Sequence, residues 1–231
     1  MFRLLAAGWL TMTFCGSAMA GTLMPVNTDF STLPSNFQLA DFATENATAV
    51  LSIDDVAGSM GLVFRGTWTV VEGGVEDAIG IYRPQLLDTS ELIFAPADND
   101  GIVSVGFTLD AQLADPTGTN VTRLFAQLVV YQQLPSGFIR GYTQLRRPVV
   151  IMPGPSTGYV VEGLVPADFD DGNGNQPDFG PDARPLAFGL QLGGRIATPA
   201  NAPGSYMGGV DADNWTVTID NGVSIFSDSF E

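Results

Sequence analysis

The sequence predicts an all-β protein, built as an antiparallel sandwich or barrel. Apolar and polar residues alternate in short runs from residue 21 onward, which is the pattern of half-buried strands. Gly, Pro, Asn and Asp separate these runs, as turn residues do. Helical periodicity is weak throughout the same part of the chain. The 231 residues suffice for one large β domain.

Nine segments carry the alternation and are expected to be strands. We see no internal repeat and no low-complexity linker between them, so we expect residues 21–224 to form a single domain. In chain order the expected strands span residues 48–54, 61–71, 78–87, 101–113, 120–134, 137–151, 157–165, 184–194 and 213–220.

The alternation also predicts which side chains form the core, because every second residue of a strand points to the same face. Trp68 belongs to an apolar row of the second expected strand. Three later strands have one apolar face each, and burying each such side chain stabilises the fold by about 2 kcal/mol. These rows are Val103, Val105, Phe107 and Leu109; Leu186, Phe188, Leu190 and Leu192; and Trp215, Val217 and Ile219.

The first twenty residues have the features of a secretory signal peptide. Arg3 is a positive start, residues 4–14 are apolar but too short to span a bilayer, and Ala18-Met19-Ala20 is a cleavage motif. We expect cleavage after Ala20 and a secreted, periplasmic or cell-surface protein with no membrane segment after cleavage. Cys15 is the one cysteine, so the mature chain would contain no disulfide.

The charge balance excludes several classes of partner and of chemistry. Nine arginines stand against 25 acidic residues, lysine and histidine are absent, and the formal net charge is −16. Such a chain repels nucleic acid and anionic membrane surfaces, and it suits divalent cations. Without histidine or a mature cysteine it can build no Ser-His-Asp triad, no thiol nucleophile and no usual zinc site.

The stretch ADFDDGNGNQPDFGPDA, residues 167–183, is a candidate calcium loop. Calcium takes six to eight oxygen ligands, and glycines let the backbone curl around the ion. The loop does not follow the EF-hand pattern, because Gln176 and Asp182 replace the required Gly and Glu. A polar surface loop has the same composition, and this alternative stays open. The candidate ligands are Asp168, Asp170, Asp171, Asn173, Asn175 and Asp178.

Two expected strands, 120–134 and 137–151, flank the turn sequence LPSG and form a candidate binding face. If their apolar rows face the core together, aromatic, amide and guanidinium side chains share the outer face. Such groups suit sugars, because rings stack on apolar sugar faces and planar groups hydrogen-bond to hydroxyls. Ordinary decoration of a solvated face is the alternative. The candidate ligand contacts are Gln127, Tyr131, Arg140, Tyr142 and Gln144.

The closing segment GGVDADNWTVTID, residues 208–220, resembles the last strand of jelly-roll carbohydrate-binding modules and lectin-like domains of exported bacterial proteins. The resemblance implies an antiparallel β-sandwich of jelly-roll type. It also implies a structural calcium ion held by Asp213, with Asp211 as a neighbour. The tail IFSDSFE, residues 225–231, resembles the ends of many exported proteobacterial proteins, and its role stays open.

Three functions remain open after these observations. The first is a non-catalytic module that binds extracellular glycan on a sheet face and holds a structural calcium ion. The second is a structural or adhesive surface protein without a small ligand. The third is an enzyme resembling jelly-roll polysaccharide lyases, for which YTQLRR at 142–147 has suitable residue types but lacks the histidine usual in that family.

Overall fold

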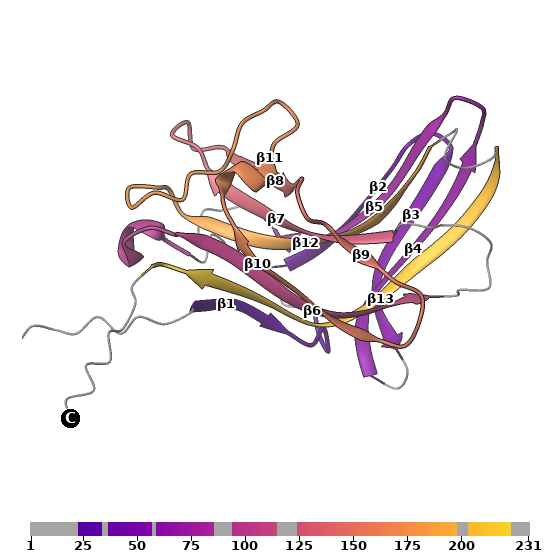
Figure 1. Ribbon diagram of the computed structural model, residues 1–231, viewed down its shortest axis with the longest axis horizontal. Coiled ribbons are helices and arrows are strands. Elements are labelled where there is room, and N and C mark those ends of the chain that lie inside the picture. Colours follow the sequence, from indigo (N-terminus) through magenta and orange to yellow (C-terminus); the bar gives the residue numbers. More distant parts are fainter. Residues whose placement is uncertain are drawn as a thin grey trace, which may run out of the picture.

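The computed structural model of the chain describes residues 23–33, 37–56, 59–85, 94–114, 124–197 and 203–222. The predicted signal peptide and the tail at 225–231 lie outside these residues. Within them, two antiparallel sheets pack face to face, which confirms the predicted β-sandwich (Figure 1). In these ranges no helix is both long and apolar enough to cross a membrane.

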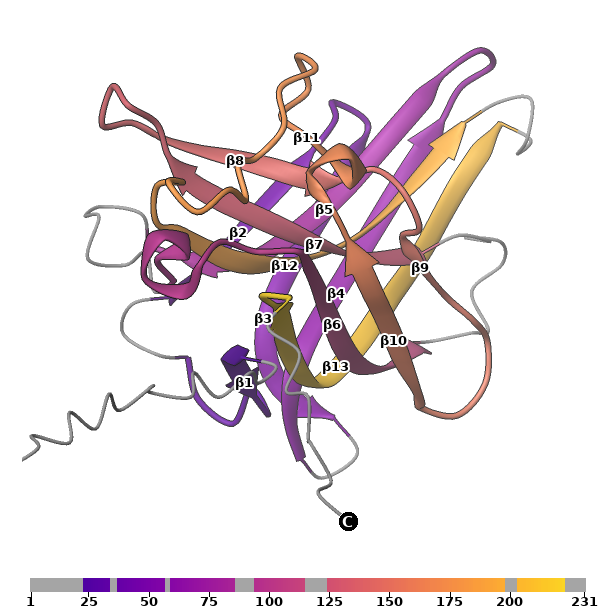
Figure 2. The same cartoon turned by 60° about the vertical axis from the view of Figure 1, so that its left-hand side comes forward.

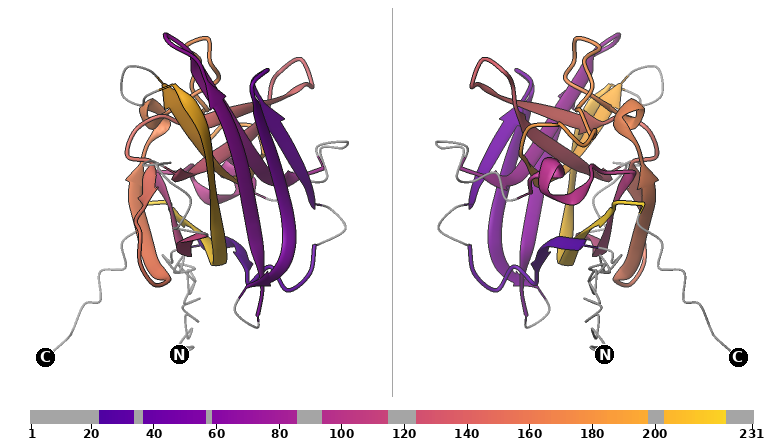
Figure 3. Two further views of the ribbon diagram at one scale, coloured as in Figure 1. Left: turned by 90° about the vertical axis from the view of Figure 1, so that its right-hand side faces the viewer. Right: turned by 90° about the vertical axis from the view of Figure 1, so that its left-hand side faces the viewer.

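Sheet A has six strands among the described residues, in the order β10-β6-β13-β4-β3, and β1 also pairs with β13. Its long strands run across the direction of β7 and β8 in the other layer (Figure 3). The bounds in sheet A are β1 Leu23–Thr28, β3 Ala47–Val56, β4 Ser59–Val70, β6 Ser104–Ala114, β10 Thr157–Leu164 and β13 Gly204–Asp220.

Sheet B has seven strands among the described residues, in the order β11-β8-β7-β12-β5-β2, and β9 also pairs with β7. In the part of the chain that the structure describes, two short 3-10 helices lie in the connections, η2 at Pro96–Asn99 and η3 at Pro166–Asp168. The bounds in sheet B are β2 Phe37–Ala43, β5 Val75–Pro84, β7 Leu124–Gln133, β8 Ile139–Gln144, β9 Val149–Ile151, β11 Phe169–Asp170 and β12 Leu186–Ala197.

The apolar rows predicted from the sequence are buried in the core, with one exception. Trp68 and the rows of β12 and β13 have at most 1% of their surface exposed. Val103 is 54% exposed, because it precedes β6 and does not belong to its inward row. Between the sheets, the ring of Tyr82 meets Phe30 and Trp215 edge-on, at centroid distances of 5.2 and 5.7 Å.

The segment expected as one strand at 137–151 is two strands, β8 and β9, which pair with successive parts of β7. β8 pairs with β7 as far as Val129, and β9 begins pairing at Ala126, so a seam separates them. The side chain of Gln144, which has no exposed surface, closes this seam. Its Oε1 accepts the Leu128 N–H at 3.0 Å, and its Nε2 donates to the carbonyl oxygens of residues 146 and 147 at 2.8 and 2.9 Å.

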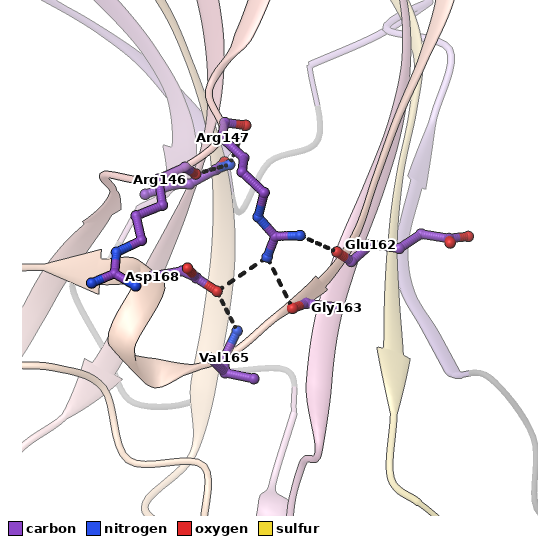
Figure 4. Close-up of polar contacts among 7 residues, drawn as sticks. Arg146, Arg147, Glu162, Gly163, Val165 and Asp168 are labelled. Carbon is purple, nitrogen blue, oxygen red and sulfur yellow. Dashed lines mark hydrogen bonds and ion pairs between the residues drawn. The ribbon is translucent and has the colours of Figure 1, made fainter.

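Arg147 connects the seam to sheet A. Its backbone has a φ of 55°, a conformation that residues other than glycine seldom adopt. Its guanidinium donates to the carbonyl oxygens of Glu162 and Gly163, both at 3.0 Å, and contacts the Asp168 carboxylate at 3.2 Å (Figure 4). These contacts hold the end of β10 and the end of η3 against the turn after β8.

Replacing Gln144 by Leu is expected to lower the free energy of unfolding by about 2 kcal/mol or more. The change leaves the buried Leu128 N–H without an acceptor, and an unmade buried hydrogen bond is costly. Urea unfolding of the two proteins measures the difference. Gln133→Ala is the matched control, because Gln133 is only half-buried, and it should change stability by about 0.5 kcal/mol or less. Equal unfolding midpoints for Gln144→Leu and wild type would contradict this role.

Candidate functional site

The five residues expected on one binding face are divided between the two faces of sheet B, so that expectation is wrong. Directly paired residues of neighbouring strands point to the same side of a sheet. Tyr142 pairs with a fully buried core residue of β7. Arg140, Tyr142 and Gln144 therefore point to the inner side, and only Gln127 and Tyr131 point outward.

The turn between β7 and β8 explains this error. Gln133 pairs with Ile139, so residues 134–138 form the connection. The sequence interpretation placed the outward residues of β7 beside the even-numbered residues of β8. Because side chains alternate with a period of two, a shift of one residue exchanges the faces of a whole strand. The observed pairing buries the large ring of Tyr142 and leaves Gly141 on the outer side.

The three inward residues have structural contacts. Arg140 Nη1 lies 3.0 Å from Asp171 Oδ2 and ties the acidic loop to β8. Tyr142 is 3% exposed, and burial raises the pKa of its hydroxyl. Gln144 closes the seam between β8 and β9. Since the tyrosine and the glutamine of YTQLRR are buried, this motif does not present the face that a lyase would need.

The outer face of sheet B carries a row of mostly small side chains along β12. This strand lies between β7 and β5 (Figure 2). At Gly189 and Gly193 an added Cβ would lie 2.8 and 2.7 Å from carbonyl oxygens of β5, so a larger residue cannot enter without moving that strand. We call this row the β12 strip; it consists of Ala187, Gly189, Gln191, Gly193 and Arg195.

Longer, half-buried side chains stand on both sides of the β12 strip, whose own residues are buried except for Arg195 at one end. An apolar pair flanks Gly193, and an amide faces an aliphatic side chain across Gln191. At about 3.3 Å per residue, the distance from Gly189 to Arg195 is about 20 Å. The flanking residues are Phe125 and Gln127 of β7, and Ile79, Ile81 and Arg83 of β5.

Two glutamine amides form the centre of the strip. Gln191 Nε2 donates to Gln127 Oε1 at 3.1 Å, and Gln127 Nε2 donates to the Gln144 carbonyl oxygen at 2.6 Å. These bonds fix the planes of both amides. An amide group has two donors and two acceptor sites, so each keeps capacity for a ligand hydroxyl.

The two ends of the strip carry different groups, an ion pair at one end and a buried tyrosine at the other. At one end the Arg195 guanidinium binds the Asp77 carboxylate through two contacts, of 2.7 and 2.8 Å. At the other end Tyr131 is only 5% exposed, and its ring fits between Gly141 and Gly189. Burial raises the pKa of Tyr131 to about 12, although Arg83 acts in the opposite direction. The ring of Tyr131 is thus part of the surface's support and is not free to stack on a ligand.

The acidic loop at 167–183 closes one end of the sandwich. Phe179 lies in the core against Phe169, with ring centroids 6.1 Å apart. The side chain of Gln132 holds the loop through the Asp178 carbonyl oxygen at 2.7 Å and the Asp178 N–H at 2.8 Å. The loop therefore packs as part of the fold around a buried phenylalanine.

The four aspartates predicted as calcium ligands in this loop have partners within the protein. Asp168 contacts Arg147, while Asp170 and Asp178 accept backbone N–H groups two residues further on. Asp171 accepts the backbone N–H groups of Asn173 and Asn175 and the Asn175 side-chain amide, and this last bond is the main cause that lowers its pKa. In the described part of the chain, no group of three or more His, Cys, Asp and Glu side chains is placed to hold a metal ion.

Asp213 lies elsewhere, on the outer face of sheet A. It pairs with Asp110 of β6, and burial, followed by repulsion from Asp29 and Asp110, raises its pKa. The next residue, Asn214, has a φ of 49° and donates to Asp110 Oδ2 at 2.9 Å. The seven predicted calcium ligands therefore do not form one site, and calcium binding stays a prediction.

No protein-family model and no curated protein sequence matches the chain. Solved structures similar in fold are carbohydrate-binding modules, the family that the closing strand resembles. The family 11 module of Lic26A-Cel5E from Clostridium thermocellum has 12% identity, a TM-score of 0.44, and coverage of 87% of this chain and 95% of its own. A family 22 module of Paenibacillus barcinonensis Xyn10C has 7% identity, a TM-score of 0.41, and coverage of 84% and 99%. This likeness concerns the fold and assigns no binding role to individual residues of this chain.

Sequence reasoning missed most of the surface now at the centre of the site. The apolar row of β12 was read correctly, and the β12 strip is the opposite row of the same strand. Its alternating small residues were the available signal. The partners from β5 carried no signal, because the sequence does not show that β5 lies beside β12. The residues missed are Ile79, Ile81, Arg83, Phe125, Gln191 and Arg195.

The calcium prediction has a direct test in thermal unfolding. Bound calcium would raise the melting temperature over that in chelator, since a ligand of the folded state stabilises it by mass action. Calcium in the 167–183 loop would compete with Arg140 for Asp171, so the Asp171→Asn variant should lose the shift and Asp54→Asn, an exposed site outside the loop, should keep it. Identical melting curves with calcium and with chelator would contradict the prediction.

Proposed function

We propose that the chain is an exported, non-catalytic module that binds extracellular glycan along the β12 strip. The observation that carries the proposal is the combination of a row of mostly small side chains, flanking apolar side chains and oriented amides on one sheet face. Export rests on the signal-like first twenty residues.

The chemistry of the strip suits a sugar chain. Phe125 and Ile79 flank Gly193 and offer apolar surface to the apolar faces of sugar rings. Gln127 and Gln191 offer amide donors and acceptors at the centre. Because the strip runs for about 20 Å along one strand from Gly189 to Arg195, it suits an extended chain better than a compact small molecule.

Preorganisation supports the same proposal. The Gln191–Gln127–Gln144 hydrogen bonds fix the amide planes before any ligand binds. Ordering a free side chain on binding costs about 0.5–1.5 kcal/mol, and a surface that is already ordered avoids this cost. Gln144 thus supports the surface from beneath, although it does not reach it.

Titration calorimetry against a panel of neutral and sparsely acidic polysaccharides tests the proposal. We expect one class to bind, and we expect Phe125→Ala and Gln127→Ala each to weaken that binding about tenfold or more, as loss of one central contact does. The matched controls are Phe138→Ala, at a 76% exposed phenylalanine before β8, and Gln112→Ala on the outer face of sheet A. Both controls should bind as wild type does.

Two outcomes would overturn the proposal. One is the absence of binding across the panel by a protein with a normal melting curve, which would favour the adhesive or structural alternative. The other is an equal loss of affinity in Phe138→Ala and Phe125→Ala, which would place the ligand outside the β12 strip.

A further inference from the structure

Arg83 differs from the other arginines that the structure describes. Arg65, Arg140, Arg147 and Arg195 each have an aspartate carboxylate within 2.7–3.2 Å. Arg83 has no such ion pair among the described residues, although the protein has 25 acidic side chains. It is half-buried, whereas Arg146 and Arg184, which also lack an ion pair there, are exposed.

Among the described residues, the surroundings of Arg83 offer no anionic acceptor for its guanidinium. Its Nε is shielded from solvent and has no hydrogen-bond partner. Tyr131 lies close enough to interact with its guanidinium, and a tyrosine phenol is uncharged at neutral pH. The neighbours of Arg83 by register are Gly189 on β12 and Gln38 on β2, neither of which is charged. Among the described residues no carboxylate competes for this guanidinium, so a carboxylate from outside would pair with it without displacing an aspartate.

We propose that Arg83 receives the carboxylate of an acidic sugar, so that the β12 strip selects a glycan bearing uronic acid groups. The inference rests on the proposed function and names its substrate class. A guanidinium matches a planar carboxylate with two parallel hydrogen bonds. The Asp77 carboxylate, which neutralises Arg195, lies about 20 Å away at the other end of the strip, so it does not compensate Arg83.

The net charge of the protein limits how many acidic groups the favoured glycan can carry. A protein with a formal charge of −16 repels a dense polyanion, so the favoured ligand is a neutral chain with widely spaced acidic side groups. At physiological ionic strength the Debye length is about 8 Å, so one carboxylate at Arg83 is largely screened from distant aspartates. Arg83 then attracts a carboxylate of the glycan at one end of the strip, while the rest of the same glycan makes neutral contacts along it.

A matched pair of polymers tests the inference. One is a neutral polysaccharide with sparse uronic acid side groups, and the other is the same polymer after reduction of its carboxyl groups to hydroxymethyl groups. Calorimetry should show that wild type binds the acidic polymer about 10- to 100-fold more tightly, as expected for one charge-assisted contact. Arg83→Gln should bind both polymers equally, and Arg146→Gln, at an exposed arginine off the strip, should keep the preference.

The outcomes separate this inference from the proposed function. Equal binding of both polymers by wild type, or a preference that survives Arg83→Gln, would overturn the role of Arg83 while leaving a glycan-binding strip. Binding of neither these polymers nor any neutral glycan would overturn the proposed function as well. The wild-type comparison alone decides the matter if Arg83→Gln does not fold.

Discussion

The pairing of β7 with β8 and β12 is the constraint on which the rest of the structure depends. It places the odd-numbered residues of β7, β8 and β12 together on the outer face of sheet B. The same pairing directs Tyr142 and Gln144 inward. Tyr142 packs in the core, and Gln144 closes the seam between β8 and β9. A slip of one residue would exchange these roles, because the faces of a strand alternate. The surface proposed for recognition is therefore a consequence of the register.

The few basic side chains of this acidic chain act mainly as clamps. Arg147 joins the seam of sheet B to the end of β10 (Figure 4). Arg140 ties the acidic loop to β8. Each ion pair at the surface contributes little alone, but hydrogen bonds from one guanidinium to several carbonyl oxygens fix the position of whole segments. In a chain whose single cysteine is Cys15, such clamps and the core between the sheets hold the connections in place.

The parts that the sequence predicted are those in which one face of a strand is uniformly large and apolar. The rows of Leu186 to Leu192 and of Trp215 to Ile219 have this pattern, and both are buried as expected. β8 has no such row, since Tyr142 stands among polar residues, so its orientation depends on the turn at 134–138. The acidic loop was ambiguous because calcium ligands and tight turns use the same residues, so its sequence alone does not predict contacts such as those of Asp171 with Asn173 and Arg140. The neighbours across β12 depend on strand order, which local patterns do not contain.

The most direct measurement of the central claim is a map of backbone amide chemical shifts during titration with a glycan that binds. If the outer face of sheet B is the recognition surface, the shifts that change will belong to β5, β7 and β12, centred on Gln127, Gln191 and Gly193. Shift changes confined to the outer face of sheet A, around Val50 and Met207, would contradict the account.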